Sequence, residues 1–466
     1  MYIPPSPLSG VRPIQPDPIA PRHAGSTGHA AAAVNAGSTM SAGGRADRDG
    51  RPNVSAAMVS TNANIGVALS GGGIRAAIFH LGVLRRLAEL GLLENLRHIS
   101  TVSGASLAVA LLYAKNEGRF PDSQTYLHRT LPAIRSTILK NDIQDRALMS
   151  LTVRPWNWRR KANLVAEAIE QLWDVRGDIR DLPPDPLWSI NCTTFETGKD
   201  FRITQKKMGD YKVGYTLSPS ISIAEASAAS AGFPVLIGPY RLSAKSCGWA
   251  DSGRKVLHLW DGGVYDNLGL EALYKISGGG HLTGDLNYLI VSNASASSGY
   301  VERDFFSPVK NLRRLLNITM DQVDALRSRD VTDYLERTGN GCYLKICSVP
   351  ARSAGDGMGK RAEAVTGTAA EAAAAAKGAA GDRTGTVASG IQRPPGKAVH
   401  LSGASLQNSA AETGPPDALS PEEVSYVKHY PTTLSSPAPE DFDLILRHGY
   451  EVAREKIFTP SKVSFR

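Results

Sequence analysis

The feature that most constrains this chain is a pair of short apolar segments, each followed by small residues and a helical pattern. The first is Asn64–Ser70, which precedes Gly71–Gly73 and apolar residues at helical spacing up to Leu93. The second is Ile99–Ser103, after which a helical pattern begins at Leu107. Strand, helix, strand and helix in short succession predict a parallel sheet covered on both faces. We therefore expect an α/β fold, a three-layer α/β/α sandwich with a mostly parallel central sheet.

Composition divides the rest of the chain. Residues 1–60 are rich in Pro, Gly, Ala and Ser without an apolar period, which predicts a disordered N-terminal tail. Residues 351–424 have the same character, and we expect a low-complexity mobile insert there. Residues 61–350 form the predicted globular domain, in which residues 122–182 are expected to be a helical cap region. Residues 425–466 are expected to return to the core as a C-terminal helix.

Charge and cysteine content set limits on partners and location. The formal net charge of +8 favours acidic partners such as anionic lipid surfaces or nucleic acid, unless the arginines are simply scattered. The four cysteines form no C-x-x-C pair, so no zinc site is expected, and their sparseness fits a reducing compartment. The N-terminus lacks a signal-peptide pattern, and no run of eighteen apolar residues exists. We expect a cytoplasmic protein that approaches membranes only peripherally.

The glycine turn after the first strand is a candidate anion site. Gly71, Gly72 and Gly73 allow positive φ and expose N–H groups at a helix N-terminus, where a phosphate or an oxyanion is favoured. The turn satisfies a loose dinucleotide-binding pattern, but the next strand ends in Ser103 and not in the acidic residue that would hold a ribose. An oxyanion hole and a turn required only for packing therefore remain the two interpretations.

The second corner supplies a candidate nucleophile. Gly104-Ala105-Ser106-Leu107-Ala108 approximates the G-x-S-x-G elbow, in which a tight strand-to-helix turn exposes the central serine. The same four leading residues recur at 403–406, inside the expected insert, so context and not the string favours Ser106. The alternative for Ser106 is a helix N-cap.

A carboxylate is the best candidate for the base that a serine nucleophile needs. Asp261 follows the apolar run Val256–Trp260 and precedes two glycines, which predicts a position at the carboxyl end of a strand. It can accept the proton of Ser106 directly or merely cap the turn. None of the ten histidines occupies the usual place of a triad histidine, but His80 and His258 keep open a Ser-His-Asp esterase or thioesterase acting on soluble esters.

These three motifs occur in the order and contexts of the patatin-like phospholipase family, which the chain resembles from about residue 64 to about residue 295. The resemblance implies a patatin-like fold and a lipid acyl hydrolase that works through an acyl-enzyme intermediate. It assigns Ser106 as the nucleophile and Asp261 as the base, forming a catalytic dyad. It also implies an oxyanion hole made by Gly71, Gly72, Gly73 and Arg75, while Ala108 stands where the family's elbow has its last glycine.

The resemblance further implies lipid or phospholipid as substrate, no cofactor, no metal and no nucleic-acid partner. A non-catalytic lipid-binding module with the same fold is the remaining alternative. Trp156 and Trp158 lie among cations in Arg154–Lys161, a composition that suits a membrane interface. The same residues could instead pack a capping helix or, as a third option, bind nucleic acid.

Overall fold

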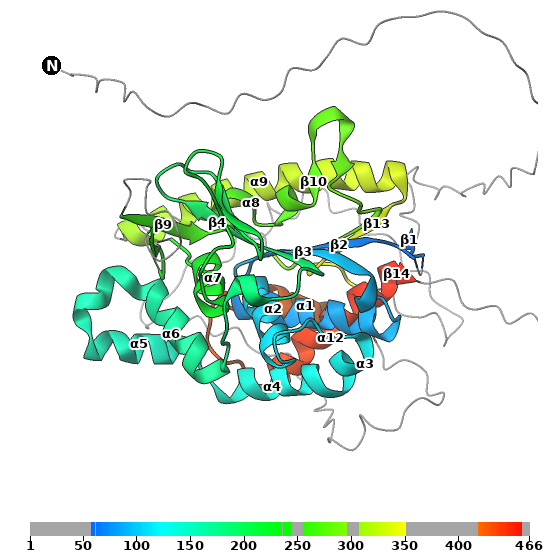
Figure 1. Ribbon diagram of the computed structural model, residues 1–466. Coiled ribbons are helices and arrows are strands. Elements are labelled where there is room, and N and C mark those ends of the chain that lie inside the picture. The colour runs from blue at the N-terminus through cyan, green and yellow to red at the C-terminus, as the bar shows by residue number, and fades with distance from the viewer. Residues whose placement is uncertain are drawn as a thin grey trace, which may run out of the picture. The chain divides into compact units, whose positions relative to one another are not determined.

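The computed structural model describes residues 57–60, 62–234, 236–244, 255–295, 307–350 and 418–458. Nearly all of the predicted tail and insert therefore lie outside the described residues. The described part is built around one large sheet with helices on both faces (Figure 1). The predicted α/β/α sandwich is confirmed.

The large sheet combines a parallel centre with an antiparallel extension. Its strands are β2 (Ile65–Leu69), β3 (Leu96–Val102), β4 (Leu187–Thr194), β5 (Asp200–Ile203), β6 (Lys207–Asp210), β7 (Gly214–Leu217), β8 (Tyr240–Ser243), β9 (Val256–Asp261), β12 (Tyr288–Asn293) and β13 (Gly341–Lys345). The order is β13-β12-β2-β3-β4-β5-β6-β7, and β9 pairs with both β4 and β8. The pairs from β13 to β4 are parallel, and those from β4 outward are antiparallel.

Eleven helices are described: α1 (Gly73–Glu89), α2 (Gly104–Ala114), α3 (Ser123–Thr125), α4 (Leu131–Lys140), α5 (Ile143–Val153), α6 (Lys161–Trp173), α7 (Ile223–Ser230), α8 (Gly263–Asp266), α9 (Pro308–Thr338), α11 (Pro421–His429) and α12 (Pro439–Lys456). Short helical turns are η1 (Leu93–Asn95), η2 (Tyr126–Thr130), η3 (Pro155–Arg160), η4 (Ile179–Asp181), η5 (Leu270–Ala272) and η6 (Ser277–Gly279). Two small strand pairs, β1 (Ala57–Met58) with β14 (Ile457–Phe458) and β10 (Tyr274–Lys275) with β11 (His281–Leu282), complete the secondary structure.

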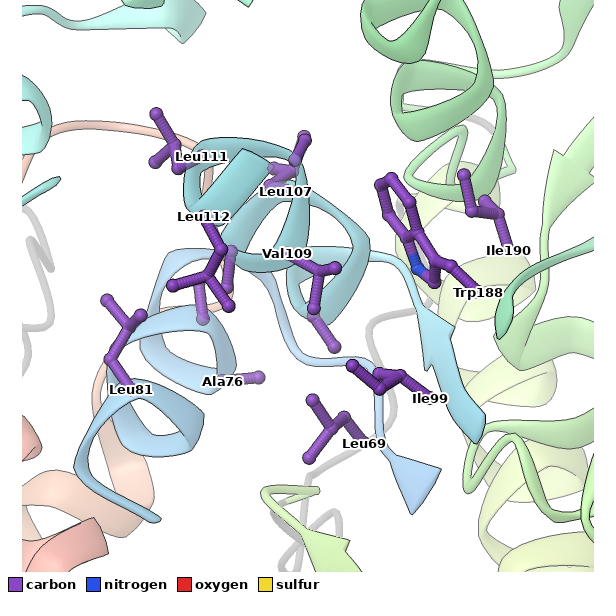
Figure 2. Packing of buried hydrophobic residues seen from close by; sticks show 14 of the residues in the cluster. Leu69, Ala76, Leu81, Ile99, Leu107, Val109, Leu111, Leu112, Trp188 and Ile190 are labelled. Carbon is purple, nitrogen blue, oxygen red and sulfur yellow. The ribbon is translucent and has the colours of Figure 1, made fainter. Parts of the chain in front are cut away.

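Alternation along the central strands places apolar side chains on both faces of the sheet. On β2, Val67 belongs to the larger apolar cluster, with α1, α2 and α12, while Ala68 belongs to a smaller one. The smaller cluster includes Val331 and Leu335 of α9. Figure 2 shows residues of the larger cluster, where side chains of α1 and α2 pack against Leu69 and Ile99. The sheet is thus a buried middle layer.

Two of the predicted boundaries can be compared with helices. The predicted cap region contains α3 to α6. Helix α11 begins at Pro421, so the last four residues of the predicted insert are helical. Helix α12 packs against α1 so closely that a Cβ on Gly449 would meet the backbone of Phe79. The chain from Pro421 onward therefore completes the core. Of the helices in the described ranges, none combines the length and the apolar character needed to cross a bilayer.

Candidate active site

The pairing of β4 brings two distant strand ends together. Strand β3 runs parallel to β4 and ends with Val102 opposite Asn191. Strand β9 runs antiparallel to β4 and ends with Asp261 opposite Cys192, the next residue along β4. Because β3 and β9 approach each other head-on beside β4, the residue that follows β3 must lie near Asp261. That residue is Ser103.

Ser103 occupies the sharp corner between β3 and α2. Its φ of 54° and ψ of −120° are unusual for a residue with a side chain, and such strained positions concentrate at functional sites. The following residue, Gly104, begins α2, so the corner has the strand-turn-helix form of a nucleophile elbow. The Ser103 amide donates to Ser230 Oγ at 2.9 Å, which fixes the corner to the end of α7.

Asp261 forms a hydrogen-bonded pair with Ser103. The Asp261 carboxylate is buried and accepts two hydrogen bonds, one from the Gly263 amide at 2.8 Å and one from the Ser103 side chain. Burial raises the pKa of Asp261 to about 6, although both hydrogen bonds act in the opposite direction. A serine hydroxyl next to a carboxylate with this pKa has the arrangement of nucleophile and base.

The structure places Ser106 elsewhere, and this corrects the predicted position of the elbow. Ser106 is the third residue of α2, is fully buried, and bonds Thr101 Oγ1 and Ser230 Oγ at 2.9 Å each. Ser230 donates its own proton to the Asn191 carbonyl, so Ser106 must be the donor toward Ser230. No hydrogen bond joins Ser106 to Asp261 within the described residues. The corner lies three residues earlier than the G-x-S-x-G match, which also explains why Ala108 is tolerated inside a helix.

The glycine turn lies directly against the serine corner. Gly104 touches Gly73 so closely that a Cβ at Gly104 would overlap the Gly73 backbone, and a Cβ at Gly71 would come within 3.2 Å of Ser103 Cβ. Positive φ values of 143° at Gly72 and 64° at Gly73 shape this turn. A glycine is required at both positions because side chains rarely adopt such φ values.

The amides of this turn have different partners. Gly71 donates to the Asn267 carbonyl at 3.0 Å, and Ile74 donates to the Thr433 carbonyl at 2.8 Å. The amides of Gly72 and Gly73 make no hydrogen bond to any described residue. Of the three predicted glycines, Gly72 and Gly73 can therefore offer donors to an oxyanion, next to the N-terminus of α1. The Gly71 amide is already used to hold the turn.

The Arg75 side chain stabilises the glycine turn through hydrogen bonds to the backbone. Its guanidinium is buried and donates to three backbone carbonyls, those of Lys428 (3.0 Å), Tyr430 (2.8 Å) and Ala294 (3.3 Å). Among the described residues no carboxylate pairs with it, and burial lowers the pKa of Arg75 to about 10. These contacts tie the turn to the chain that follows the insert, a bracing role that its prediction as an oxyanion-hole residue did not include.

Neither histidine of the alternative triad contacts this pair. His80 is buried, with Nδ1 at 2.9 Å from Ser292 Oγ and Nε2 at 2.9 Å from the Ser70 carbonyl. Burial lowers the pKa of His80 to about 4, so it is neutral at pH 7. His258 lies in β9 with Nδ1 at 2.7 Å from Glu196. Among the described residues, no three His, Cys, Asp or Glu side chains gather as they would to hold a metal ion.

The side chains of the two predicted membrane-contact residues are exposed and are not buried in the core. Trp156 and Trp158 in η3 are 75% and 65% exposed. The idea that they anchor a capping helix by burial is therefore wrong.

Sequence reasoning missed Ser103, Ser230 and Thr433. One available signal was the position of Ser103 itself, since the predicted strand Ile99–Ser103 ends on a serine followed by glycine. Ser230 accepts a hydrogen bond from the Ser103 amide, 127 residues away in the chain, and the Thr433 carbonyl accepts one from the Ile74 amide. No local sequence pattern marks either contact.

Comparison with known proteins relates this region to a protein family by sequence similarity. The sequence model of the patatin-like phospholipase family matches residues 67–274, which include the glycine turn, the serine corner and Asp261. Residues 67–274 therefore resemble the patatin-like phospholipase family in sequence, and the resemblance noted from the motifs is confirmed.

Individual relatives are more distant or match only a short segment. Cytosolic phospholipase A2 gamma of Mus musculus is 52% identical over 52 residues, which are 11% of this chain and 9% of that protein. Human GIVD cytosolic phospholipase A2 in complex with methyl gamma-linolenyl fluorophosphonate has 14% identity and a TM-score of 0.40, covering 84% of this chain and 57% of that one. VipD from Legionella pneumophila has 17% identity and a TM-score of 0.28, covering 61% of each chain.

Proposed function

We propose that this protein is a lipid acyl hydrolase in which Ser103 is the nucleophile and Asp261 is its base. The observation that carries this proposal is the hydrogen bond between the Ser103 side chain and the buried Asp261 carboxylate, at a strained strand-to-helix corner. The match of residues 67–274 to the sequence model of the patatin-like phospholipase family supports lipid esters as the substrate class. This proposal keeps the predicted pair of a serine and Asp261, but the serine is Ser103 and not Ser106.

Acylation follows from the positions of these groups. Asp261 accepts the Ser103 proton as Oγ forms a bond to the ester carbonyl carbon, and the carbonyl oxygen becomes an oxyanion. The free amides of Gly72 and Gly73 donate to that oxygen, and each such donor contributes about 2.7–4 kcal/mol in comparable hydrolases. The ester C–O bond then breaks, Asp261 returns the proton to the departing alcohol or lysolipid, and the acyl group remains on Ser103.

Deacylation repeats the same steps with water. Asp261 takes a proton from a water molecule whose oxygen attacks the acyl carbonyl carbon. The bond to Ser103 Oγ breaks, Oγ recovers the proton from Asp261, and the fatty acid leaves. One base therefore serves both halves of the reaction, and its pKa of about 6 leaves it ionised at pH 7.

Both alternatives from the sequence have weaker support. A Ser-His-Asp triad would need a histidine within hydrogen-bond reach of the serine, and His80 and His258 are bonded to other partners. A purely lipid-binding module does not explain why a serine is held in a strained conformation beside a carboxylate of raised pKa.

The proposed function is tested by the products formed from a mixed lipid extract. The wild type should release free fatty acids together with lysolipids or alcohols, and in water labelled with heavy oxygen the label should enter the fatty acid. The Ser103→Ala variant should release none above background, as followed by mass spectrometry. Equal release by both proteins would exclude Ser103 as the nucleophile, and no release by a folded wild type would reject the function.

The raised pKa of Asp261 predicts a specific pH profile. The base must be ionised, so kcat/KM should fall about tenfold per pH unit below about pH 6 and level off above it. The measurement uses an uncharged soluble ester, so that substrate ionisation does not contribute, and circular dichroism checks that the protein remains folded. A profile that stays flat from about pH 5 to about pH 8 would contradict Asp261 as the base.

A further inference from the structure

An exposed apolar and cationic surface lies at the end of α5 and along η3. We call it the η3 surface: its apolar side chains are Leu148, Met149, Val153, Trp156 and Trp158, each 53–75% exposed. Large apolar side chains exposed this closely together are unusual on a monomer unless they bind something. Because tryptophan is enriched at the membrane–water interface, we propose that the η3 surface docks onto an anionic lipid bilayer. This inference rests on the proposed function.

The charges around the η3 surface favour an anionic partner. Residues 148–162 include four cations and no acidic residue. Arg154 is paired with Glu167 at 2.6 Å, and Lys161 lies 4.9 Å from the Trp158 ring centre. Arg159 and Arg160 make no ion pair with any described residue. Cations beside interfacial tryptophans are the composition by which amphipathic segments bind acidic lipid surfaces.

A second element repeats this composition. The first turns of α9, residues 308–320, carry three cations and no acidic residue. Val309, Leu312 and Leu315 in these turns are 49–60% exposed. The first turns of α9 lead to the active site, because the Met320 side chain lies beside Gly263, two residues after Asp261. Figure 1 shows α9 on the opposite face of the sheet from α1 and α2, and next to α8.

The η3 surface is also coupled to the catalytic elements. Helix α6 continues directly from η3, and the Asn163 side chain on α6 exchanges two hydrogen bonds of 3.1 Å with the Arg241 backbone on β8. Strand β8 pairs with β9, which ends at Asp261. Docking at η3 would therefore bring the lipid surface to an element that is linked through β8 and β9 to the base.

The experiment measures sedimentation of the full chain with two kinds of vesicle. One is phosphatidylcholine alone, and the other is phosphatidylcholine mixed with phosphatidylserine in about equal parts. We expect the wild type to prefer the anionic vesicles. Trp156→Ala/Trp158→Ala should weaken binding about tenfold or more. Arg159→Gln/Arg160→Gln should weaken it about 30-fold on anionic vesicles alone, since each cation contributes about 1 kcal/mol.

A matched control uses exposed apolar residues on a different element, the strand β7. Tyr215 and Leu217 on β7 are 52% and 78% exposed, and the Tyr215→Ala/Leu217→Ala variant should bind vesicles as the wild type does. Equal loss in this variant, or wild-type binding by the tryptophan variant, would overturn the proposal. Retention of a DNA oligonucleotide but not of vesicles would assign the surface to nucleic acid and would also overturn it.

Hydrolysis of a short soluble ester separates this proposal from the proposed function. The tryptophan variant should keep the wild-type rate on the soluble ester and lose activity only on vesicles. A wild type that hydrolyses the soluble ester but binds neither vesicle would overturn the docking surface and leave the acyl hydrolase intact. A wild type that binds anionic vesicles through η3 without Ser103-dependent hydrolysis would support the surface and reject the activity.

Discussion

Ser103→Ala should lower kcat/KM by about 10³-fold or more, whereas Ser106→Ala should stay within about tenfold of the wild type. The two serines lie three residues apart, so each variant controls for the other. Removing Ser103 Oγ removes the atom that forms the acyl-enzyme. Removing Ser106 Oγ only breaks two hydrogen bonds, to Thr101 and Ser230, which retain other partners.

The Ser106→Ala substitution should lower the free energy of unfolding and leave kcat unchanged. A buried neutral hydrogen bond contributes about 1 kcal/mol, so the midpoint of urea unfolding should shift slightly while kcat is preserved. Rates are measured on a soluble ester with both variants at equal folded concentration. If Ser106→Ala were the inactive variant and Ser103→Ala the active one, the proposed dyad would be refuted.

Asp261→Asn should lower kcat by about 10³–10⁴-fold, because asparagine cannot accept the Ser103 proton. The amide is close in shape to the carboxylate, so its Oδ1 can still accept the Gly263 amide and the β4–β9 pairing is unaffected. The measurement is single-turnover hydrolysis of a soluble ester, with the acylation and deacylation phases resolved. Retention of more than about a tenth of the wild-type rate would show that another group is the base.

The same substitution should not destabilise the fold. The pKa of Asp261 is raised in the folded state, so the ionised carboxylate lowers the free energy of unfolding. This destabilisation is zero below about pH 4 and reaches its full size above about pH 6. At pH 7 this corresponds to about 3 kcal/mol before the loss of hydrogen bonds is counted. Asp261→Asn should therefore have a thermal midpoint equal to or above that of the wild type at pH 7. A large drop would mean that the carboxylate is needed for folding.

The sequence predicted the layers of the fold, but it placed the strand-to-helix corner three residues too late, at Ser106 and not at Ser103. The motif G-x-S-x-G fits Gly104–Ala108, and the pattern alone cannot show that β3 ends at Val102. The choice between Ser103 and Ser106 depends on where β3 and β9 meet along β4. That register is set by pairing between segments about 70–90 residues apart, which no local spacing encodes.

The contacts of Arg75 could not be predicted from the sequence either. The family resemblance assigned it to the oxyanion hole. The structure shows it held by carbonyls of Lys428 and Tyr430, from a segment that follows the insert. Trp156 and Trp158 are exposed, and their contact with a membrane stays a prediction.

The most direct test of the proposed catalytic serine is covalent labelling of the full-length protein by a fluorophosphonate, which reacts with activated serines. The labelled peptide that spans β3 and α2 contains both candidates, and fragmentation in the mass spectrometer assigns the adduct to one of them. The dyad of Ser103 and Asp261 predicts an adduct on Ser103 that is lost in Asp261→Asn and kept in Ser106→Ala. An adduct on Ser106, or no adduct on a folded wild type, would contradict it.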